Sequence, residues 1–311
     1  MTSFAAVSTF LPPSVPISEL REESRLDARQ IRRFERFYGL SEVCRDPERD
    51  EEELLLTAAA KLDELRGQEE RVRYLVQART FPSSRPDPTG ALRRIGAELG
   101  LTNATAFSVT GQACASALQA VDVCGRLLAA DGDPDALALV LAGEKTFTPI
   151  ARCVPRSNVG GEAAAAVLVR HGRAGDADRV LGGATRTYGQ FHDEVITGEA
   201  SPPEFDKLYP EALAEVMLAA CEDSGTALGD IDLIIPHSVN IISWQGIANN
   251  FDLPLERIFL DNIPVTGHCF SADPFINYGT AGQLGRLRPG ARYLLTAVGL
   301  GATFSAMVVQ H

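Results

Sequence analysis

One cysteine stands where a thiol could act as a nucleophile. Residues 109–121 read VTGQACASALQAV, which places Cys114 among small side chains at the start of a helical pattern. The unpaired N–H groups and the dipole at a helix N-terminus stabilise a thiolate, and small neighbours let a thioester approach the sulfur closely. This pattern is typical of an activated nucleophile that takes up an acyl group.

Two of the five histidines follow strand-like segments. His237 comes shortly after an apolar run in IDLIIPHSVN, and His268 lies beside a glycine in FLDNIPVTGHCFSAD. Because the carboxyl ends of strands in an α/β sheet converge on one crevice, we expect Cys114, His237 and His268 to meet there. A thiol with two nearby imidazoles is suited to acyl transfer assisted by general acid–base catalysis.

A turn near the C-terminus offers donors for a developing negative charge. The segment AVGLGATFSA (297–306) predicts two strands joined by a Gly-containing turn. The backbone N–H groups of Gly299, Leu300 and Gly301 would join that of Cys114 in an oxyanion hole.

Two further polar residues are candidates for orienting a catalytic group. Asp273 follows His268 by five residues, in SADP. It would complete a Cys-His-Asp arrangement suited to activating an acceptor hydroxyl or amine; the alternative is that it caps a helix or forms a turn. Asn240, in PHSVN, is the second candidate.

Short apolar runs alternate with helical patterns along the whole chain. Strands are predicted at 72–78, 136–143, 163–170, 232–238, 291–299 and 305–311. Helices are predicted at 51–66, 114–130, 207–223 and 240–250. The alternation predicts an α/β fold with a largely parallel or mixed sheet covered by helices. The polar segment HGRAGDADR (171–179) would divide it into two similar halves, 1–170 with the cysteine and 171–311 with the histidines.

The composition excludes several classes of protein. With 45% hydrophobic and 23% charged residues the chain is globular, and its net charge of −12 argues against nucleic acid as a partner. No apolar run reaches the roughly 20 residues that span a bilayer, and we read no secretory signal. Six scattered cysteines without a C-x-x-C pair favour reduced thiols. We therefore predict a cytoplasmic protein.

One basic segment departs from this acidic character. In RLDARQIRRFERF, arginines recur at helical spacing: Arg25, Arg29, Arg32, Arg33 and Arg36. They form either a solvated helix face or a docking patch for an acidic partner.

We expect no metal site and no cofactor. His192, Asp193 and Glu194 are neighbours, but adjacent side chains on a helix or strand point apart and seldom bind one ion together.

Taken in order, the motifs resemble the ketoacyl-acyl-carrier-protein synthase III family of thiolase-fold condensing enzymes over nearly the whole chain. VTGQACASALQAV resembles the family's nucleophile elbow, LALVLAGEKT the strand that follows, and VGGEAAAAVLV its Gly-Asp-Gly-Ala-rich strand. PHSVN resembles the Pro-His-Gln-Ala-Asn motif, and GHCFSA stands where Gly-Asn-Thr-Ser-Ala is usual. VGLGATFSAMVV resembles the Gly-rich final hairpin, and FPSS (81–84) a segment near the dimer interface.

The resemblance implies a thiolase-like, five-layered αβαβα fold of two similar halves, and a homodimer. It gives Cys114 the role of taking the acyl group from a thioester. His237 aligns with the family's histidine, and His268 stands where the family has asparagine.

Two departures bear on the reaction. A Cys-His-His set resembles the elongating ketoacyl synthases, in which two histidines assist malonyl decarboxylation. With Asp273, the site instead resembles synthase III-like enzymes of antibiotic pathways that transfer acyl groups without forming a carbon–carbon bond. Residues 29–43 also lack the family's tryptophan and arginine that hold coenzyme A. A donor bound to an acidic carrier protein would use the arginine face instead.

Our leading hypothesis is a cysteine-dependent acyltransferase of natural-product (polyketide) biosynthesis, in which His237 assists proton transfer. The acyl group would come from a carrier-protein or CoA thioester and pass to a carrier thiol or to a small hydroxyl or amine acceptor. The alternative is decarboxylative Claisen condensation with a malonyl-carrier protein. A catalytically silent subunit would have lost Cys114, which is retained. Candidate pocket walls are Phe81, Phe191, Phe205, Tyr209 and Phe270.

Overall fold

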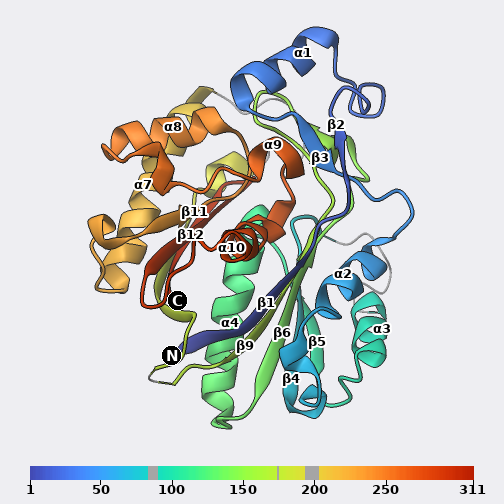
Figure 1. The fold of residues 1–311 in the computed structure, drawn as a ribbon, viewed down its shortest axis with the longest axis vertical. Helices are drawn as coiled ribbons and strands as arrows, with labels where there is room; N and C mark the ends of the chain where they lie inside the picture. The colour runs from blue at the N-terminus through green and yellow to red at the C-terminus, as the bar shows by residue number, and fades with distance from the viewer. Residues whose placement is uncertain (83–89, 174, 193–202) are drawn as a thin grey trace.

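The computed structural model describes residues 1–82, 90–173, 175–192 and 203–311 (Figure 1). Its strands are β1 (Thr2–Phe10), β2 (Ser14–Pro16), β3 (Glu42–Cys44), β4 (Val72–Ala78), β5 (Thr105–Val109), β6 (Leu137–Gly143), β7 (Cys153–Val154), β8 (Asn158–Val159), β9 (Ala164–His171), β10 (Arg179–Thr187), β11 (Leu233–Ile235), β12 (Arg292–Gly299) and β13 (Thr303–Gln310).

The helices are α1 (Ala28–Arg33), α2 (Glu51–Ala59), α3 (Gly90–Glu98), α4 (Ser116–Asp131), α5 (Pro149–Arg152), α7 (Pro203–Asp223), α8 (Ile241–Asn250), α9 (Ile263–Thr266) and α10 (Asp273–Gln283). A π-helical turn, Phe34–Tyr38, continues α1. Short helical turns precede α4 and α10.

Nine strands form a mixed sheet in the order β11-β12-β13-β10-β1-β9-β6-β4-β5. β4 pairs in parallel with β5 and β6, while β9 and β1 are antiparallel to their neighbours. β11 and β12 are likewise parallel, and β13 and β10 antiparallel. Only Thr2 and Ser3 of β1 pair with β10, so the contact between the two groups of strands is short.

We propose that the chain divides into the two similar halves 1–170 and 171–311. The strand order supports this division. Outward from the contact between the two groups, the first half runs β1-β9-β6-β4 and the second half runs β10-β13-β12-β11, so the strands follow the same order in each half. The proposed boundary falls between the end of β9 and the start of β10.

Helices alternate with the strands in five layers. α2 packs on β1, β6 and β9, and α3 on β4 and β5, on the outer face of the first half. α7 packs on β10 and β13 of the second half. Between the two groups of strands lie α4, which contacts β9 and β13, and α10, which contacts β1 and β12. This arrangement confirms the predicted αβαβα architecture.

The central helix α4 is apolar because it is enclosed. The stretch Ala113–Asp131 is the one helix in the described ranges whose length and composition would suffice to cross a membrane. Its buried side chains, among them Leu118, Val121 and Leu128, belong to the core between the strand layers. The helix therefore has the contacts of a core helix, and the cytoplasmic location stays a prediction.

The strands β1 and β10 and the helix α2 differ from the sequence-based expectation. The strands β1 and β10 were not predicted, because their small and glycine residues give little hydrophobic periodicity. The helix predicted at 51–66 starts at the Asp50–Glu53 capping box but ends at Ala59. Ending there lets the chain turn so that Leu62 and Leu65 reach the core.

Candidate active site

Cys114 lies in the helical turn Ala113–Ala115 that leads into α4, and its residue is 4% exposed. The preceding Ala113 has a φ of 46°, in the left-handed region that non-glycine residues seldom adopt. The end of β12 lies directly against this turn: a Cβ on Gly299 would stand 2.0 Å from the Gln112 carbonyl oxygen. Only glycine allows this close approach, which supports the prediction that the turn after β12 forms the oxyanion hole with Cys114.

His268 is the imidazole that contacts the nucleophile. Its Nε2 lies 3.1 Å from Cys114 Sγ, and its Nδ1 lies 2.5 Å from Asp273 Oδ2. The backbone N–H groups of Ser238 and Cys269 also donate to the Asp273 carboxylate, at 2.6 and 2.7 Å. The structure thus brings Cys114, His268 and Asp273 into one row, in which three hydrogen bonds fix the Asp273 carboxylate.

The surroundings of His268 favour its charged form. Burial alone would lower the pKa of His268, but the charges of Asp273 and Cys114 and the hydrogen bonds to both raise it well above the usual 6.5. An imidazolium next to the sulfur stabilises a thiolate, the form in which a cysteine attacks.

His237 reaches the same cavity in a different way. Its side chain is fully buried, and its Nε2 lies 2.8 Å from the hydroxyl of Tyr209. Burial, and next the charge of His268, lower the pKa of His237 to about 3, so it is neutral at physiological pH. We expected His237 to move the proton, but the geometry favours His268, because only His268 has a ring nitrogen at hydrogen-bond distance from Cys114 Sγ.

Asn240 does not orient a histidine in this structure. Its Oδ1 accepts from the backbone N–H of Ser243 at 2.9 Å, which caps α8, and its Nδ2 donates to the Ser157 carbonyl at 3.0 Å. Its role is therefore that of a helix cap.

A cavity of about 60 Å³ opens onto the sulfur. It is lined by Cys114, His237, His268, Gly299 and Leu300, together with aromatic side chains. Among the predicted wall residues, Phe81, Phe205, Tyr209 and Phe270 line it. Phe191 was expected there too, but it belongs to the core of the second half, where its ring meets that of Phe205 edge to face at 5.5 Å between centroids.

A larger groove of about 250 Å³ lies outside this cavity. The two share Ser157, Phe205, Tyr209 and Val239, so the groove leads to the cavity. Its outer wall includes Tyr38, Arg156 and Ile242.

Known proteins are similar to this chain in sequence. A sequence model of the 3-oxoacyl-[acyl-carrier-protein] synthase III C-terminal domain matches residues 221–311, which contain His237, His268 and Asp273. The β-ketoacyl-[acyl-carrier-protein] synthase III of Lactobacillus delbrueckii subsp. bulgaricus is 26% identical over 260 residues, 77% of this chain and 78% of that protein. The chain is similar to the ketoacyl-acyl-carrier-protein synthase III family over 77% of its length. This is a family of acyl-transferring enzymes.

Solved structures show the same fold as this synthase III-like chain. The 3-oxoacyl-[acyl-carrier-protein] synthase III of Aquifex aeolicus VF5 superposes with a TM-score of 0.84 at 21% identity, over all of both chains. ChlB3, which is named as an acyltransferase, superposes with a TM-score of 0.85 at 19% identity, over 99% of this chain and 97% of its own. These likenesses confirm the thiolase-like fold.

In this synthase III-like chain, sequence reasoning missed Glu144. Its carboxylate accepts from the backbone N–H groups of Thr80 (2.9 Å) and Phe81 (3.1 Å), and the Thr80 hydroxyl lies 3.9 Å from Cys114 Sγ. Burial raises the pKa of Glu144 to about 7, although the hydrogen bonds to Thr80 and Phe81 oppose the shift. An acidic residue directly after the buried run LALVLAG is the signal that would have found it.

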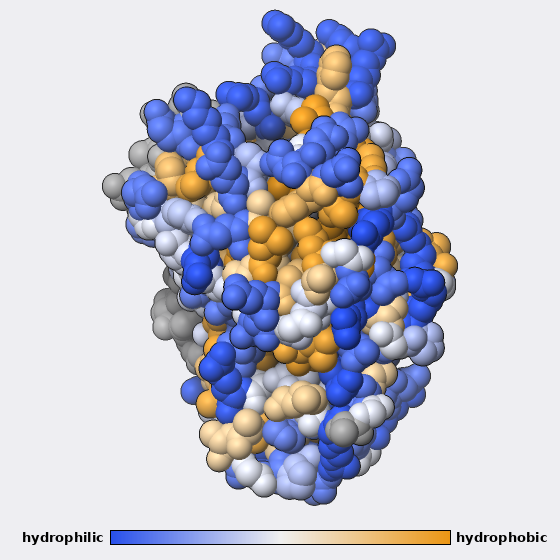
Figure 2. All heavy atoms as spheres, turned by 90° about the vertical axis from the view of Figure 1, so that its left-hand side faces the viewer, coloured by the Kyte–Doolittle hydropathy of each residue, from blue (hydrophilic) through white to orange (hydrophobic). Residues whose placement is uncertain are grey.

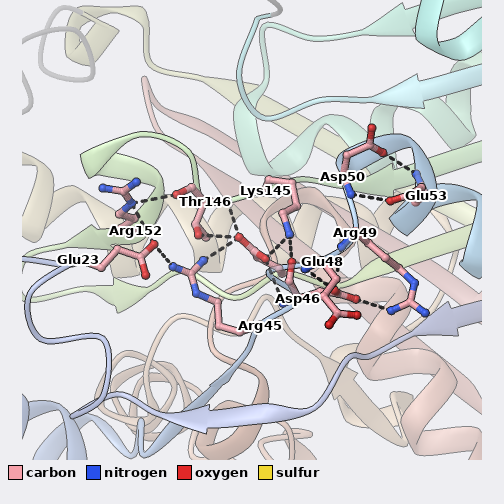
Figure 3. Close-up of polar contacts among 11 residues, drawn as sticks. Glu23, Arg45, Asp46, Glu48, Arg49, Asp50, Glu53, Lys145, Thr146 and Arg152 are labelled. Atoms are coloured by element: carbon pink, nitrogen blue, oxygen red, sulfur yellow. Dashed lines mark hydrogen bonds and ion pairs between the residues drawn. The ribbon is translucent and has the colours of Figure 1, made fainter.

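Glu162 was also not predicted from the sequence. It lies next to the segment whose backbone binds that of His268. Its side chain is buried and pairs with Arg45 at 2.7 Å and Lys145 at 2.5 Å. Figure 3 shows Arg45, Lys145 and Thr146 converging in this network, with Glu23 at its edge.

The segment just before Glu162 holds the backbone of His268. The His268 N–H donates to the Val159 carbonyl, and the Gly161 N–H donates to the His268 carbonyl, both at 2.9 Å. A shift of residues 159–162 would therefore also shift the His268 ring relative to the Cys114 sulfur.

Glu162→Gln is expected to destabilise the fold by about 3 kcal/mol, because it removes the buried negative charge that pairs with Arg45 and Lys145, whose side chains are only 11% and 20% exposed. Thermal and urea unfolding followed by circular dichroism would measure this loss. Glu23→Gln serves as the matched control, since Glu23 is a more exposed partner of the same Arg45 and should cost less than about 1 kcal/mol. Equal losses in the two variants would contradict the role of the buried network.

The predicted docking arginines are exposed beside the outer groove. Arg29, Arg32 and Arg33 lie on α1 and Arg36 on the π-helical turn. The Arg33 guanidinium lies 5.4 Å from the ring centroid of Tyr38, which lines the groove. Figure 1 shows α1 protruding at the top of the molecule, and Figure 2 shows this end covered mainly by hydrophilic residues.

Some predicted features fall partly outside the described ranges. Residues 83 and 84 of FPSS, and Asp193 and Glu194 beside His192, lie there. Within the part of the chain that the structure describes, no cluster of three or more His, Cys, Asp or Glu side chains is arranged to hold a metal.

Proposed function

We propose that the chain is a cysteine-dependent acyltransferase that passes its acyl group on without forming a carbon–carbon bond. The observation that carries the proposal is the row Cys114–His268–Asp273, with His268 at 3.1 Å from the sulfur and 2.5 Å from the carboxylate. A nucleophile, a base and an orienting acid in this order are suited to acyl transfer. The name of ChlB3, an acyltransferase of the same fold, accords with it.

In the loading step the Cys114 thiolate attacks the carbonyl carbon of a thioester. The carbonyl π electrons move to the oxygen, where the proposed N–H groups of Cys114 and the Gly299–Gly301 turn stabilise them. When the tetrahedral intermediate collapses, the donor's C–S bond breaks, and the donor thiolate leaves and takes the proton from His268. The products are the acyl-Cys114 enzyme, the free donor thiol and a neutral His268.

In the discharge step His268 acts as the base. Acylation removes the negative charge from the sulfur, which is one of the charges that raise the pKa of His268. The lone pair of the acceptor attacks the acyl carbon while its proton passes to His268 Nε2. The C–S bond then breaks, and the thiolate of Cys114 is regenerated opposite the imidazolium.

Decarboxylative condensation is the second candidate. Two histidines line the cavity, and the relatives are named as ketoacyl synthases. A malonyl thioester, however, would need donors from both imidazoles to stabilise its enolate, and Tyr209 already occupies Nε2 of His237. This contact is why we place simple transfer first.

Intact-protein mass spectrometry separates the two functions. The wild-type enzyme is loaded from a panel of acyl-CoA and acyl-carrier-protein thioesters, and then given either malonyl-carrier protein or small thiols, alcohols and amines. Transfer predicts a mass increment that the acceptors discharge with no release of carbon dioxide. Carbon dioxide release with formation of a ketoacyl product would replace this proposal by condensation.

The cavity favours a small acyl group. Its volume is about 60 Å³, against about 250 Å³ for the outer groove. The rings of Phe81 and Phe270 meet at 5.8 Å between centroids and narrow the cavity. We therefore propose short acyl donors.

We further propose that the donor is a carrier protein that docks on the arginines of α1. An acidic carrier would be attracted by exposed positive charge, and the groove beside Arg33 would guide its thioester arm to Cys114. A homodimer, a place in polyketide biosynthesis and a cytoplasmic location complete the proposal.

Arg33→Glu combined with Arg36→Glu is expected to raise KM for an acyl-carrier-protein donor by about tenfold, because like charges repel an acidic partner. KM for acyl-N-acetylcysteamine, which carries no charge, should not change. Arg126→Glu on α4 is the control, because Arg126 is also exposed but does not line the groove. Steady-state kinetics at low and high salt test this, and an equal effect of Arg126→Glu would argue against the docking site.

A further inference from the structure

Tyr209 stands where the outer groove meets the reaction cavity. It belongs to α7 and lines both spaces. Its hydroxyl lies 2.8 Å from Nε2 of His237, which is itself fully buried. A hydroxyl and an imidazole nitrogen therefore meet at the wall of the cavity that Cys114 and His268 also line.

This contact changes which atom the cavity offers to a substrate. A ring nitrogen of neutral histidine makes one hydrogen bond, as a donor or as an acceptor, so Nε2 of His237 is used by Tyr209. A phenol hydroxyl donates one hydrogen bond and also accepts. After its bond to His237, the Tyr209 oxygen can still make a second one, toward the cavity.

We propose that the Tyr209 hydroxyl, held by His237, binds the nucleophilic atom of the acceptor, and that this acceptor is a hydroxyl or an amine. The inference rests on the proposed acyl transfer. A hydroxyl oxygen has a lone pair to spare for Tyr209 while it attacks with the other, and an amine has a second N–H to donate. A thiol is a weak partner in either direction, so it gains little from this contact.

The transfer step then has two fixed points for the acceptor. The acceptor lone pair forms the bond to the acyl carbon, and its proton passes to His268 Nε2. The carbonyl π electrons move to oxygen and return as the C–S bond breaks, which leaves the Cys114 thiolate. Tyr209 exchanges no proton in this sequence. It holds the attacking atom in place, which speeds the reaction because the rate of attack depends on how the acceptor is aligned with the acyl carbon.

Tyr209→Phe tests the proposal, because it keeps the ring and removes only the hydroxyl. The acyl-enzyme is prepared from a short acyl thioester and mixed in single turnovers with n-butanol, n-butylamine or N-acetylcysteamine as probes. We expect discharge to butanol and butylamine to slow by about tenfold or more, the effect of one lost hydrogen bond in the transition state. The loading rate and discharge to N-acetylcysteamine should stay within about twofold.

Tyr188→Phe is the matched control, because the Tyr188 hydroxyl bonds Glu215 at 3.0 Å and Tyr188 does not line the cavity. Equal slowing of loading and of all three discharge reactions would show a purely structural role and overturn the proposal. Unchanged discharge to butanol and butylamine, with normal wild-type transfer, would overturn the assignment of Tyr209 alone. If the wild-type acyl-enzyme is discharged by none of the probes, the proposed function fails and this inference with it.

Discussion

Cys114→Ala is expected to take up no acyl group from any thioester. In the structure Cys114 lines the cavity and its sulfur contacts His268. Alanine has no nucleophilic atom that could form a thioester bond. Labelling should fall by at least about 1,000-fold relative to the wild type. The measurement is intact-protein mass spectrometry after incubation with acyl-CoA and acyl-carrier-protein donors.

The five remaining cysteines provide the control. All are buried in the described structure, and burial raises the pKa of Cys124 and of Cys153 to about 12, which keeps their thiols protonated. Cys153→Ala should therefore load like the wild type. A full mass increment in Cys114→Ala would show that another nucleophile carries the acyl group, and the whole catalytic scheme would be lost.

Asp273→Asn is expected to slow discharge of the acyl-enzyme by about 100- to 10,000-fold, the range that a positioned base contributes. The carboxylate of Asp273 accepts from His268 and from the backbone N–H groups of Ser238 and Cys269. An amide would have to turn its own N–H₂ toward one of these donors, so the imidazole would lose its orientation as well as its counter-charge.

The pH dependence identifies how Asp273 acts. Discharge needs neutral His268, so the wild-type rate should rise as the pH rises through the pKa of His268 in the acyl-enzyme. Burial lowers that pKa and the charge of Asp273 raises it, so Asp273→Asn should move the midpoint to lower pH. A slower reaction with an unmoved midpoint would mean that Asp273 only supports the local structure. Thermal unfolding of the variant serves as the check on folding.

Several parts of the site could be predicted from local sequence. The helical pattern after Cys114 and the small residues around it place the thiol at a helix start, since periodicity and residue size act over neighbouring positions. The apolar runs before His237 and before the Gly299 turn likewise predict the strands β11 and β12. Because strand ends gather on one side of a sheet, the meeting of Cys114, His237 and His268 around one cavity could be expected as well.

The strands β1 and β10 show where local patterns fail. β1 lies in the middle of the sheet, between β9 and β10, yet its alanines, serines and threonines give no clear alternation. Its place depends on pairing with Ala164–His171, more than 150 residues away. Pairing at that separation is set by the whole sheet and not by the sequence of the strand itself.

The sequence by itself determined the family resemblance, the α/β architecture and the set of residues able to do the chemistry. Which histidine contacts the sulfur was decided only by the tertiary structure. His268 receives Asp273 from the first turn of α10, whereas His237 receives Tyr209 from α7, a helix 28 residues earlier in the chain. Charge and burial around each ring then separate the two pKa values in opposite directions. Asp273 is only five residues from His268, but Cys114 and Tyr209 reach the two rings from positions 154 and 28 residues away. No local pattern encodes those distances.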